Sequence, residues 1–95
     1  LISVLGCDWD KGNARKNYKH GVSMAEAEQV FFNVPLLLLE DAGHRHQEPR
    51  FHALGRPDGN RVLHVSFTLR GSGTLIRVIS ARDMHRKERA AYAQA

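Results

Sequence analysis

The segment Leu63–Leu69 alternates strictly between apolar and polar side chains, and it constrains the fold more than any other part of the chain. Successive side chains of a strand point to opposite faces of a sheet, so this pattern predicts a strand with one face in a hydrophobic core. Gly71-Ser72-Gly73 supplies a turn, and a further strand is predicted over Thr74–Ser80. A connection this short requires the two strands to pair antiparallel.

The remaining segments predict an α+β domain. Ser23 and Glu26 form a capping box before one helix, and Ser80 with Asp83 is predicted to cap the last helix. Leu36–Glu40 is too short for a helix and is predicted to be a strand buried on both faces. We predict an antiparallel β-sheet of about four to five strands, with two N-terminal helices and one C-terminal helix, in one domain covering residues 1–95. Besides the two strands above, the predicted elements are a strand over Ile2–Trp9, a helix over Lys11–His20, a helix from Met24 that ends by Pro35, strands over Leu36–Glu40 and Arg50–Leu54, and a helix over Arg82–Ala93.

Charge is distributed unevenly along the 95 residues. The segment 61–95 holds seven Arg or Lys against two acids, whereas the segment 23–60 holds six acids against three arginines. If the basic ends meet in space, they form a positive surface that attracts phosphates such as those of RNA. A solvated charged surface is the alternative. No apolar run is long enough to span a membrane, and the single cysteine, Cys7, excludes an intrachain disulfide, which fits the cytoplasm.

Arginines are the first candidates for a functional site. In the predicted last helix, Arg82, Arg86 and Arg89 would share one face, and their guanidinium groups could form paired hydrogen bonds to phosphate. Arg77 lies on the preceding strand between Leu75 and Ile79, on the same face as both, where an unpaired charge would be costly. It is therefore either a site residue or the partner of an acid such as Asp8 or Glu48.

Histidines are the second candidates. Lys19-His20 ends the first predicted helix, and an imidazole is the usual group for proton transfer near neutral pH. These two side chains could equally well only complement the helix dipole. His44 and His46 do not make a metal site, which needs at least three protein ligands. His52 and His64 are predicted to be ordinary surface residues that point outward from strands.

Several separated blocks, in order, give the chain a resemblance to the BrnT family, the toxin half of a bacterial type II toxin–antitoxin pair. The blocks are Trp9-Asp10-Lys11, Asn17, Lys19-His20-Gly21-Val22-Ser23, Glu26-Ala27, Glu48, Arg50-Phe51, Ala53-Leu54-Gly55, Thr68, Arg70-Gly71, Arg77-Val78-Ile79-Ser80-Ala81-Arg82, Arg86, Glu88-Arg89 and Tyr92. The resemblance implies a RelE-like ribonuclease that cuts RNA without a metal or other cofactor and inhibits translation. It also implies a ribbon-helix-helix antitoxin of the BrnA type as partner, which contacts operator DNA for the complex.

Metal-free RNA cleavage uses the 2′-hydroxyl of the substrate as nucleophile, and it needs a base, an acid and cations around the phosphate. We assign His20 as base or acid, and Lys19, Arg77 and Arg82 as charge stabilisers. Tyr92 is a further candidate for base stacking or proton donation. The remaining RNA-binding candidates are Arg50, Arg70, Arg86 and Arg89.

Two alternatives to an active nuclease remain open from the sequence. A catalytically weak or inactive homologue could act mainly by binding the antitoxin as a corepressor. A basic domain could also bind nucleic acid without cutting it, in which case binding would weaken steeply with salt while the RNA stayed intact.

Overall fold

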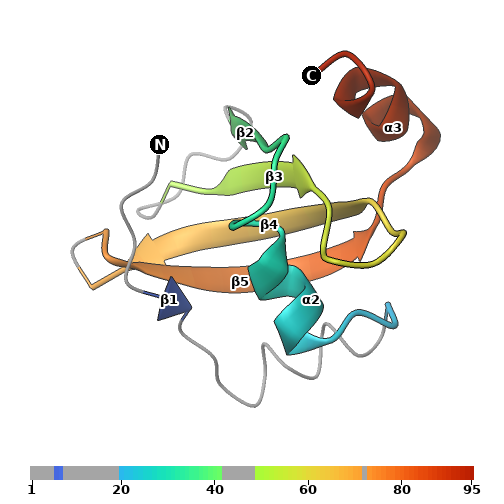
Figure 1. The fold of residues 1–95 in the computed structure, drawn as a ribbon. Coiled ribbons are helices and arrows are strands. Elements are labelled where there is room, and N and C mark those ends of the chain that lie inside the picture. Colours follow the sequence, from blue (N-terminus) through green and yellow to red (C-terminus); the bar gives the residue numbers. More distant parts are fainter. Residues whose placement is uncertain (1–5, 8–19, 42–48, 72) are drawn as a thin grey trace.

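The computed structural model describes residues 6–7, 20–41, 49–71 and 73–95, which form an α+β fold around one five-stranded sheet (Figure 1). The strand order in the sheet is β1-β5-β4-β3-β2. The strands are β1 (Gly6–Cys7), β2 (Leu37–Glu40), β3 (Phe51–Gly55), β4 (Leu63–Arg70) and β5 (Leu75–Asp83), and the described helices are α2 (Met24–Gln29) and α3 (Arg86–Tyr92). The predicted α+β class is confirmed.

The sheet is mixed, whereas an antiparallel sheet was predicted. β2, β3, β4 and β5 pair antiparallel in succession, but β1 lies parallel to β5. A parallel neighbour needs a long connection, and here the chain from β1 to β5 includes α2 and three other strands. Of the strand predicted over Ile2–Trp9, the described part is Gly6–Cys7, and of the helix predicted over Lys11–His20 only His20, which lies in a turn.

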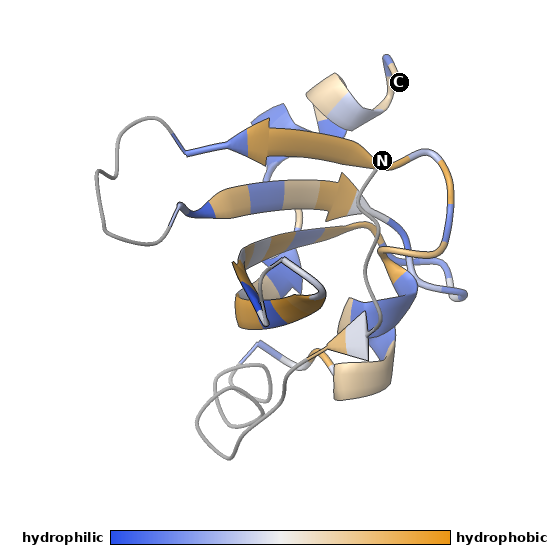
Figure 2. Cartoon of the chain, turned by 90° about the vertical axis from the view of Figure 1, so that its left-hand side faces the viewer, coloured by the Kyte–Doolittle hydropathy of each residue, from blue (hydrophilic) through white to orange (hydrophobic). Residues whose placement is uncertain are grey.

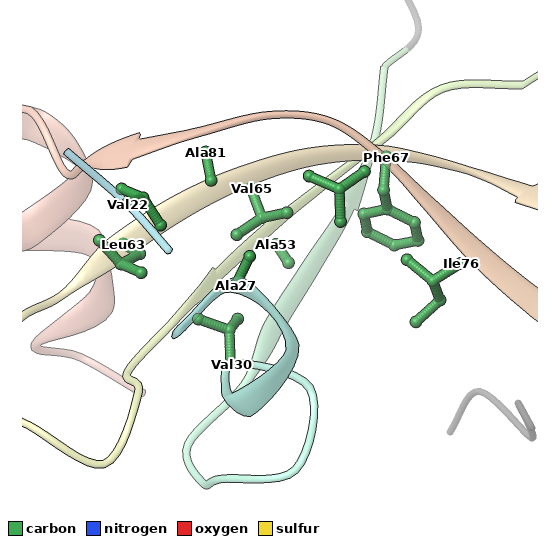
Figure 3. Close-up of a cluster of buried hydrophobic side chains, with 10 residues drawn as sticks. Val22, Ala27, Val30, Ala53, Leu63, Val65, Phe67, Ile76 and Ala81 are labelled. Atoms are coloured by element: carbon green, nitrogen blue, oxygen red, sulfur yellow. The ribbon is translucent and has the colours of Figure 1, made fainter. Parts of the chain in front are cut away.

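One face of the sheet carries the main core, as the alternation in β4 predicted. Leu63, Val65 and Phe67 are fully buried there, and Ala27 of α2 and Val30, which follows α2, pack against this face (Figure 3). The predicted capping box fixes the start of α2. The Ser23 side chain accepts a hydrogen bond of 3.1 Å from the Glu26 N–H, and the Glu26 carboxylate accepts one of 3.1 Å from the Ser23 N–H. The local sequence thereby aims the apolar side of α2 at the sheet.

Gly55, at the end of β3, lets α2 approach the sheet closely. A Cβ atom at this position would lie 2.8 Å from Val30 Cγ1 and 3.3 Å from the Val30 carbonyl oxygen. Any other residue would therefore push the end of α2 outward.

The boundary between β5 and α3 differs from the prediction. β5 continues to Asp83, since Arg82 pairs with His64 and Asp83 with Leu63, and the fully buried Ala81 lies in the core. The helix predicted from Arg82 is therefore wrong at its start, and so is the Ser80–Asp83 cap. Pairing with β4 outweighs the local capping signal. α3 instead follows His85, whose N–H donates to Glu88 Oε1 at 2.7 Å.

β2 is an edge strand, and the prediction that it is buried on both faces is wrong. Leu38 is 38% exposed and Leu39 is 56% exposed, because β2 pairs with β3 on one side and ends the strand order. In Figure 2, β2 is an almost uniformly apolar arrow beside β3, in which a hydrophilic segment interrupts the apolar ones. A continuous apolar run does not reveal whether its strand lies inside a sheet or at the edge.

A second, smaller core lies on the opposite face of the sheet and holds α3. Leu54, Met84 and Tyr92 are buried together. The Tyr92 hydroxyl donates a 2.6 Å hydrogen bond to the Pro35 carbonyl, which lies just before β2. Neither described helix is long and apolar enough to cross a membrane.

Candidate functional site: a polar cleft on the sheet face opposite α2

Polar side chains share the sheet face opposite α2, and the strand register arranges them in rows. His64 pairs with Leu54 of β3 and with Arg82 of β5. One step along β4 on the same face, Ser66 pairs with His52 and Ser80. Because the side chains of one face recur every second residue, these rows lie next to each other. The face therefore presents histidines, hydroxyls and a guanidinium side by side.

A third row brings two predicted arginines to the same face. Thr68 pairs with Arg77 of β5. On the other side, Arg50 precedes the Phe51–Phe67 pair, so the register places it next to Thr68. Thr68 is buried, and its hydroxyl finds no hydrogen-bond partner within the described segments. The sheet thus carries Arg82 at one end of the rows, and Arg50 and Arg77 at the other.

The first two rows form the floor of a cleft of about 500 Å³. One side is apolar, where Leu39 of β2 and Leu54 of β3 line it, and Arg82 and Glu88 are its charged residues. The residues that line the cleft are Leu39, His52, Leu54, His64, Ser66, Ser80, Arg82 and Glu88.

Arg82 and Glu88 form a two-pronged ion pair that ties α3 to β5. Arg82 Nη1 donates to Glu88 Oε1 at 2.7 Å, and Arg82 Nη2 donates to Glu88 Oε2 at 2.9 Å. These hydrogen bonds, together with the one from the His85 N–H, lower the pKa of Glu88 to about 2. The predicted stripe of Arg82, Arg86 and Arg89 on one helix face does not form, because Arg82 belongs to the strand.

Next to this ion pair, the two histidines are joined in a chain that starts at an acid. Asp41 Oδ2 lies 3.0 Å from His52 Nε2, and His52 Nδ1 lies 3.0 Å from His64 Nε2. The Ser66 hydroxyl also lies 3.2 Å from His52 Nδ1. His64 Nε2 is 3.9 Å from Glu88 Oε2, so the chain reaches the Arg82–Glu88 pair.

The prediction that His64 is an ordinary surface residue is wrong, whereas the His52 side chain is 26% exposed. His64 is 8% exposed, and its Nδ1 is buried with no hydrogen-bond partner within residues 6–7, 20–41, 49–71 and 73–95. Burial, followed by the nearby charge of Arg82, lowers the pKa of His64 to about 4, so this ring is neutral at pH 7. The alternation in β4 correctly put His64 on the polar face, but it could not show that Leu39 of β2 and Glu88 of α3 line a cleft on this face.

The histidine predicted from the sequence as base or acid lies elsewhere. His20 is exposed and does not line the cleft, and Lys19 lies outside the described residues. The adjacent Gly21 carbonyl accepts a 2.8 Å hydrogen bond from Arg61, which also forms ion pairs with Glu26 and Asp83. Sequence analysis gave Arg61 no role, yet it joins the turn before α2 to the end of β5.

The other predicted RNA-binding residues have different surroundings. Arg86 and Arg89 are exposed on α3, and Arg89 also donates to the Met84 carbonyl at 2.7 Å. Arg70 is partly buried at the end of β4. Tyr92 is only 6% exposed and packs in the second core, so its burial gives no support to the prediction that its ring stacks on a base.

Two further predictions concern acids and metals. Asp8 and Glu48, proposed as salt-bridge partners of Arg77, lie outside the described residues, and so do His44 and His46. Within the described part of the chain, no three His, Cys, Asp or Glu side chains are arranged to hold a metal ion.

Fold and cleft together define a small α+β protein whose sheet face combines arginines with imidazoles, a surface suited to a phosphodiester. The family model described as the ribonuclease toxin BrnT of type II toxin–antitoxin systems matches residues 9–88. The chain belongs to this family, as its sequence blocks indicated, and is therefore placed among the ribonuclease toxins. A comparison with curated proteins found no match.

Proposed function

We propose that this protein is an endoribonuclease that cleaves RNA without a metal ion, by attack of the substrate's 2′-hydroxyl on the adjacent phosphate, and thereby inhibits translation. The observation that carries the proposal is the row arrangement on one sheet face, with Arg82 and Arg77 on either side of the His52–Ser66–Ser80 row. Such a face offers cations for a phosphate and groups that can accept a proton.

In this proposal the arginines of the sheet stabilise the phosphate at which the charge develops. Arg82 and Arg77 are assigned to the reacting phosphate, and Arg50 and Arg70 to its neighbours along the backbone, because guanidinium groups form paired hydrogen bonds to phosphate oxygens. Arg86 and Arg89 on α3 extend the basic surface beyond the cleft. Lys19 and His20 stay predictions from the sequence, without support from the cleft.

The proposal includes a partner and a cellular place. As a member of a type II toxin family, the chain has an antitoxin as its counterpart. We propose a ribbon-helix-helix antitoxin of the BrnA type, contact with operator DNA through that antitoxin alone, and a cytoplasmic location. Co-expression of the chain with such an antitoxin, followed by purification through a tag on one of them, tests the pairing.

Cleavage of a defined single-stranded RNA in the presence of EDTA tests the activity. We expect the wild-type protein to cut it, and Arg77→Ala and Arg82→Ala to lose most of the activity. Arg56→Ala is the matched control, because Arg56 is exposed in the turn after β3 and lies outside the cleft. Equal cutting by all four proteins would show that the arginines of the sheet face take no part in the reaction. An absence of cutting would move the test to a translating extract, where ribosome-dependent cleavage would be seen.

One observation favours the second candidate, an inactive homologue that acts as a corepressor. Arg82 is already bound by Glu88 through two hydrogen bonds, so the cleft as it stands does not offer this guanidinium to a phosphate. If neither free RNA nor the extract is cut, while the antitoxin complex binds operator DNA more tightly than the antitoxin alone, the corepressor role is the correct one.

A further inference from the structure

Asp41, His52 and His64 form a hydrogen-bonded chain of titratable side chains, to which the family resemblance assigns no role. Its members come from three separate segments, the end of β2, β3 and β4, and each link is a contact of 3.0 Å. The Asp41 and His64 side chains are 15% and 10% exposed, and the His52 side chain is 26% exposed. His52 is therefore the member that substrate can reach from the cleft.

The neighbouring charges determine which ring nitrogen is a base. The Asp41 carboxylate can only accept, so in neutral His52 the hydrogen is on Nε2 and Nδ1 carries a free electron pair. The Nε2–H of His64 and the hydroxyl of Ser66 both face this Nδ1. Nδ1 can thus accept a hydrogen bond from the Ser66 hydroxyl. The 2′-hydroxyl of a ribose is a donor of the same kind.

Burial and the charged groups around the pair keep His64 uncharged. His52 Nδ1 and His64 Nε2 are 3.0 Å apart, so a positive charge on one ring strongly opposes a positive charge on the other. Arg82 on β5 also opposes a positive charge on His64. Asp41 faces His52, Glu88 on α3 faces His64, and the register places Arg50 one step along the same face. His64 is therefore a neutral hydrogen-bond donor that orients His52.

We propose that His52 is the general base of the RNA cleavage described above, with Asp41 and His64 as positioning residues; this inference rests on that proposed function. The 2′-hydroxyl takes the place of the 3.2 Å Ser66 contact and gives its proton to His52 Nδ1. The hydrogen bond from His64 Nε2–H to this nitrogen breaks in the same step, because a protonated Nδ1 can no longer accept it. Its oxygen forms a bond to phosphorus while the bond from phosphorus to the 5′-oxygen breaks, and this oxygen takes a proton from water. The products are a 2′,3′-cyclic phosphate and a 5′-hydroxyl end.

The test is the pH dependence of cleavage between pH 5 and 8, in EDTA at constant ionic strength, on one single-stranded RNA. The rate of the wild-type protein is expected to fall on the acid side, because a protonated His52 cannot accept the proton. His52→Gln should cut roughly 100-fold more slowly or worse and lose this acid limb. Asp41→Asn, which allows the wrong tautomer, should cut at least about 10-fold more slowly. His85→Asn is the control, because His85 is exposed beside α3 and does not line the cleft.

The results distinguish a failure of the His52 assignment from a failure of the proposed nuclease function. If the wild-type protein cuts and His52→Gln cuts within threefold of it with the same acid limb, His52 is not the base, although the protein is a nuclease. If His52→Gln does not fold, an unchanged rate and profile of Asp41→Asn overturn the inference in the same way. If wild-type protein cuts neither free RNA nor RNA in a translating extract, the proposed function fails and the base with it. The assignment of His52 as base is supported if the products carry 2′,3′-cyclic phosphate ends and if His52→Gln loses activity while His85→Asn does not.

Discussion

Arg82 on β5 holds Glu88 on α3 through two hydrogen bonds of 2.7 and 2.9 Å, and both residues line the cleft. Both side chains are about one quarter exposed. Glu88 also accepts from the His85 N–H, so one carboxylate serves the start of α3 and the arginine at once. A phosphate that binds Arg82 must therefore compete with a carboxylate in place.

Removal of this competing charge should strengthen RNA binding. Glu88→Gln keeps an oxygen that can accept from the His85 N–H but no longer neutralises Arg82. We expect a noncleavable 2′-O-methyl RNA to bind Glu88→Gln several-fold more tightly than wild type in a fluorescence anisotropy titration. Glu40→Gln changes the net charge equally, and Glu40 does not line this cleft. The same gain in both variants would mean that net charge alone is responsible.

Stability should depend on pH through His64. Its pKa is about 4 in the fold and about 6.5 in the unfolded chain, so between these values only the unfolded chain takes up the proton. The stabilising effect of the neutral ring is complete above pH 6.5 and is lost as the pH falls toward 4. Between pH 7 and 5 this corresponds to a loss of about 2 kcal/mol. Urea unfolding at both pH values should show the loss in wild type and much less of it in His64→Gln. An equal loss of unfolding free energy between pH 7 and pH 5 in His64→Gln and in wild type would show that His64 is not responsible.

The sequence predicts the parts of this fold that local patterns determine. The alternation in Leu63–Leu69 identifies a half-buried strand, and the Ser23–Glu26 box identifies the start of α2. The end of β5 could not be predicted, because Arg82 remains in the strand through its pairing with His64, a contact between segments distant in sequence. The burial of His64 could not be predicted for the same reason.

Replacement of Gly55 should destabilise the fold, because the end of α2 lies close to this position. In Gly55→Ala the added methyl group would lie 2.8 Å from Val30 Cγ1, and relief of this clash requires a shift of α2 against the sheet. We expect a loss of about 1–3 kcal/mol in the free energy of unfolding, measured by urea titration. Gly59→Ala is the matched control, because a Cβ there meets nothing within 4 Å. Similar values for the two variants would show that α2 can move at little cost.

Tyr92 provides a test that separates a structural residue from an RNA-binding one. Tyr92→Phe keeps the buried ring between Leu54 and Met84 but leaves the Pro35 carbonyl without the hydroxyl that donates to it at 2.6 Å. We expect a loss of about 1 kcal/mol in the free energy of unfolding, because a partly buried acceptor loses its partner. RNA affinity and the cleavage rate should stay at the wild-type values below the melting transition, since the ring is only 6% exposed. A folded Tyr92→Phe protein with tenfold weaker cleavage would instead show that the hydroxyl leaves Pro35 and takes part in the reaction.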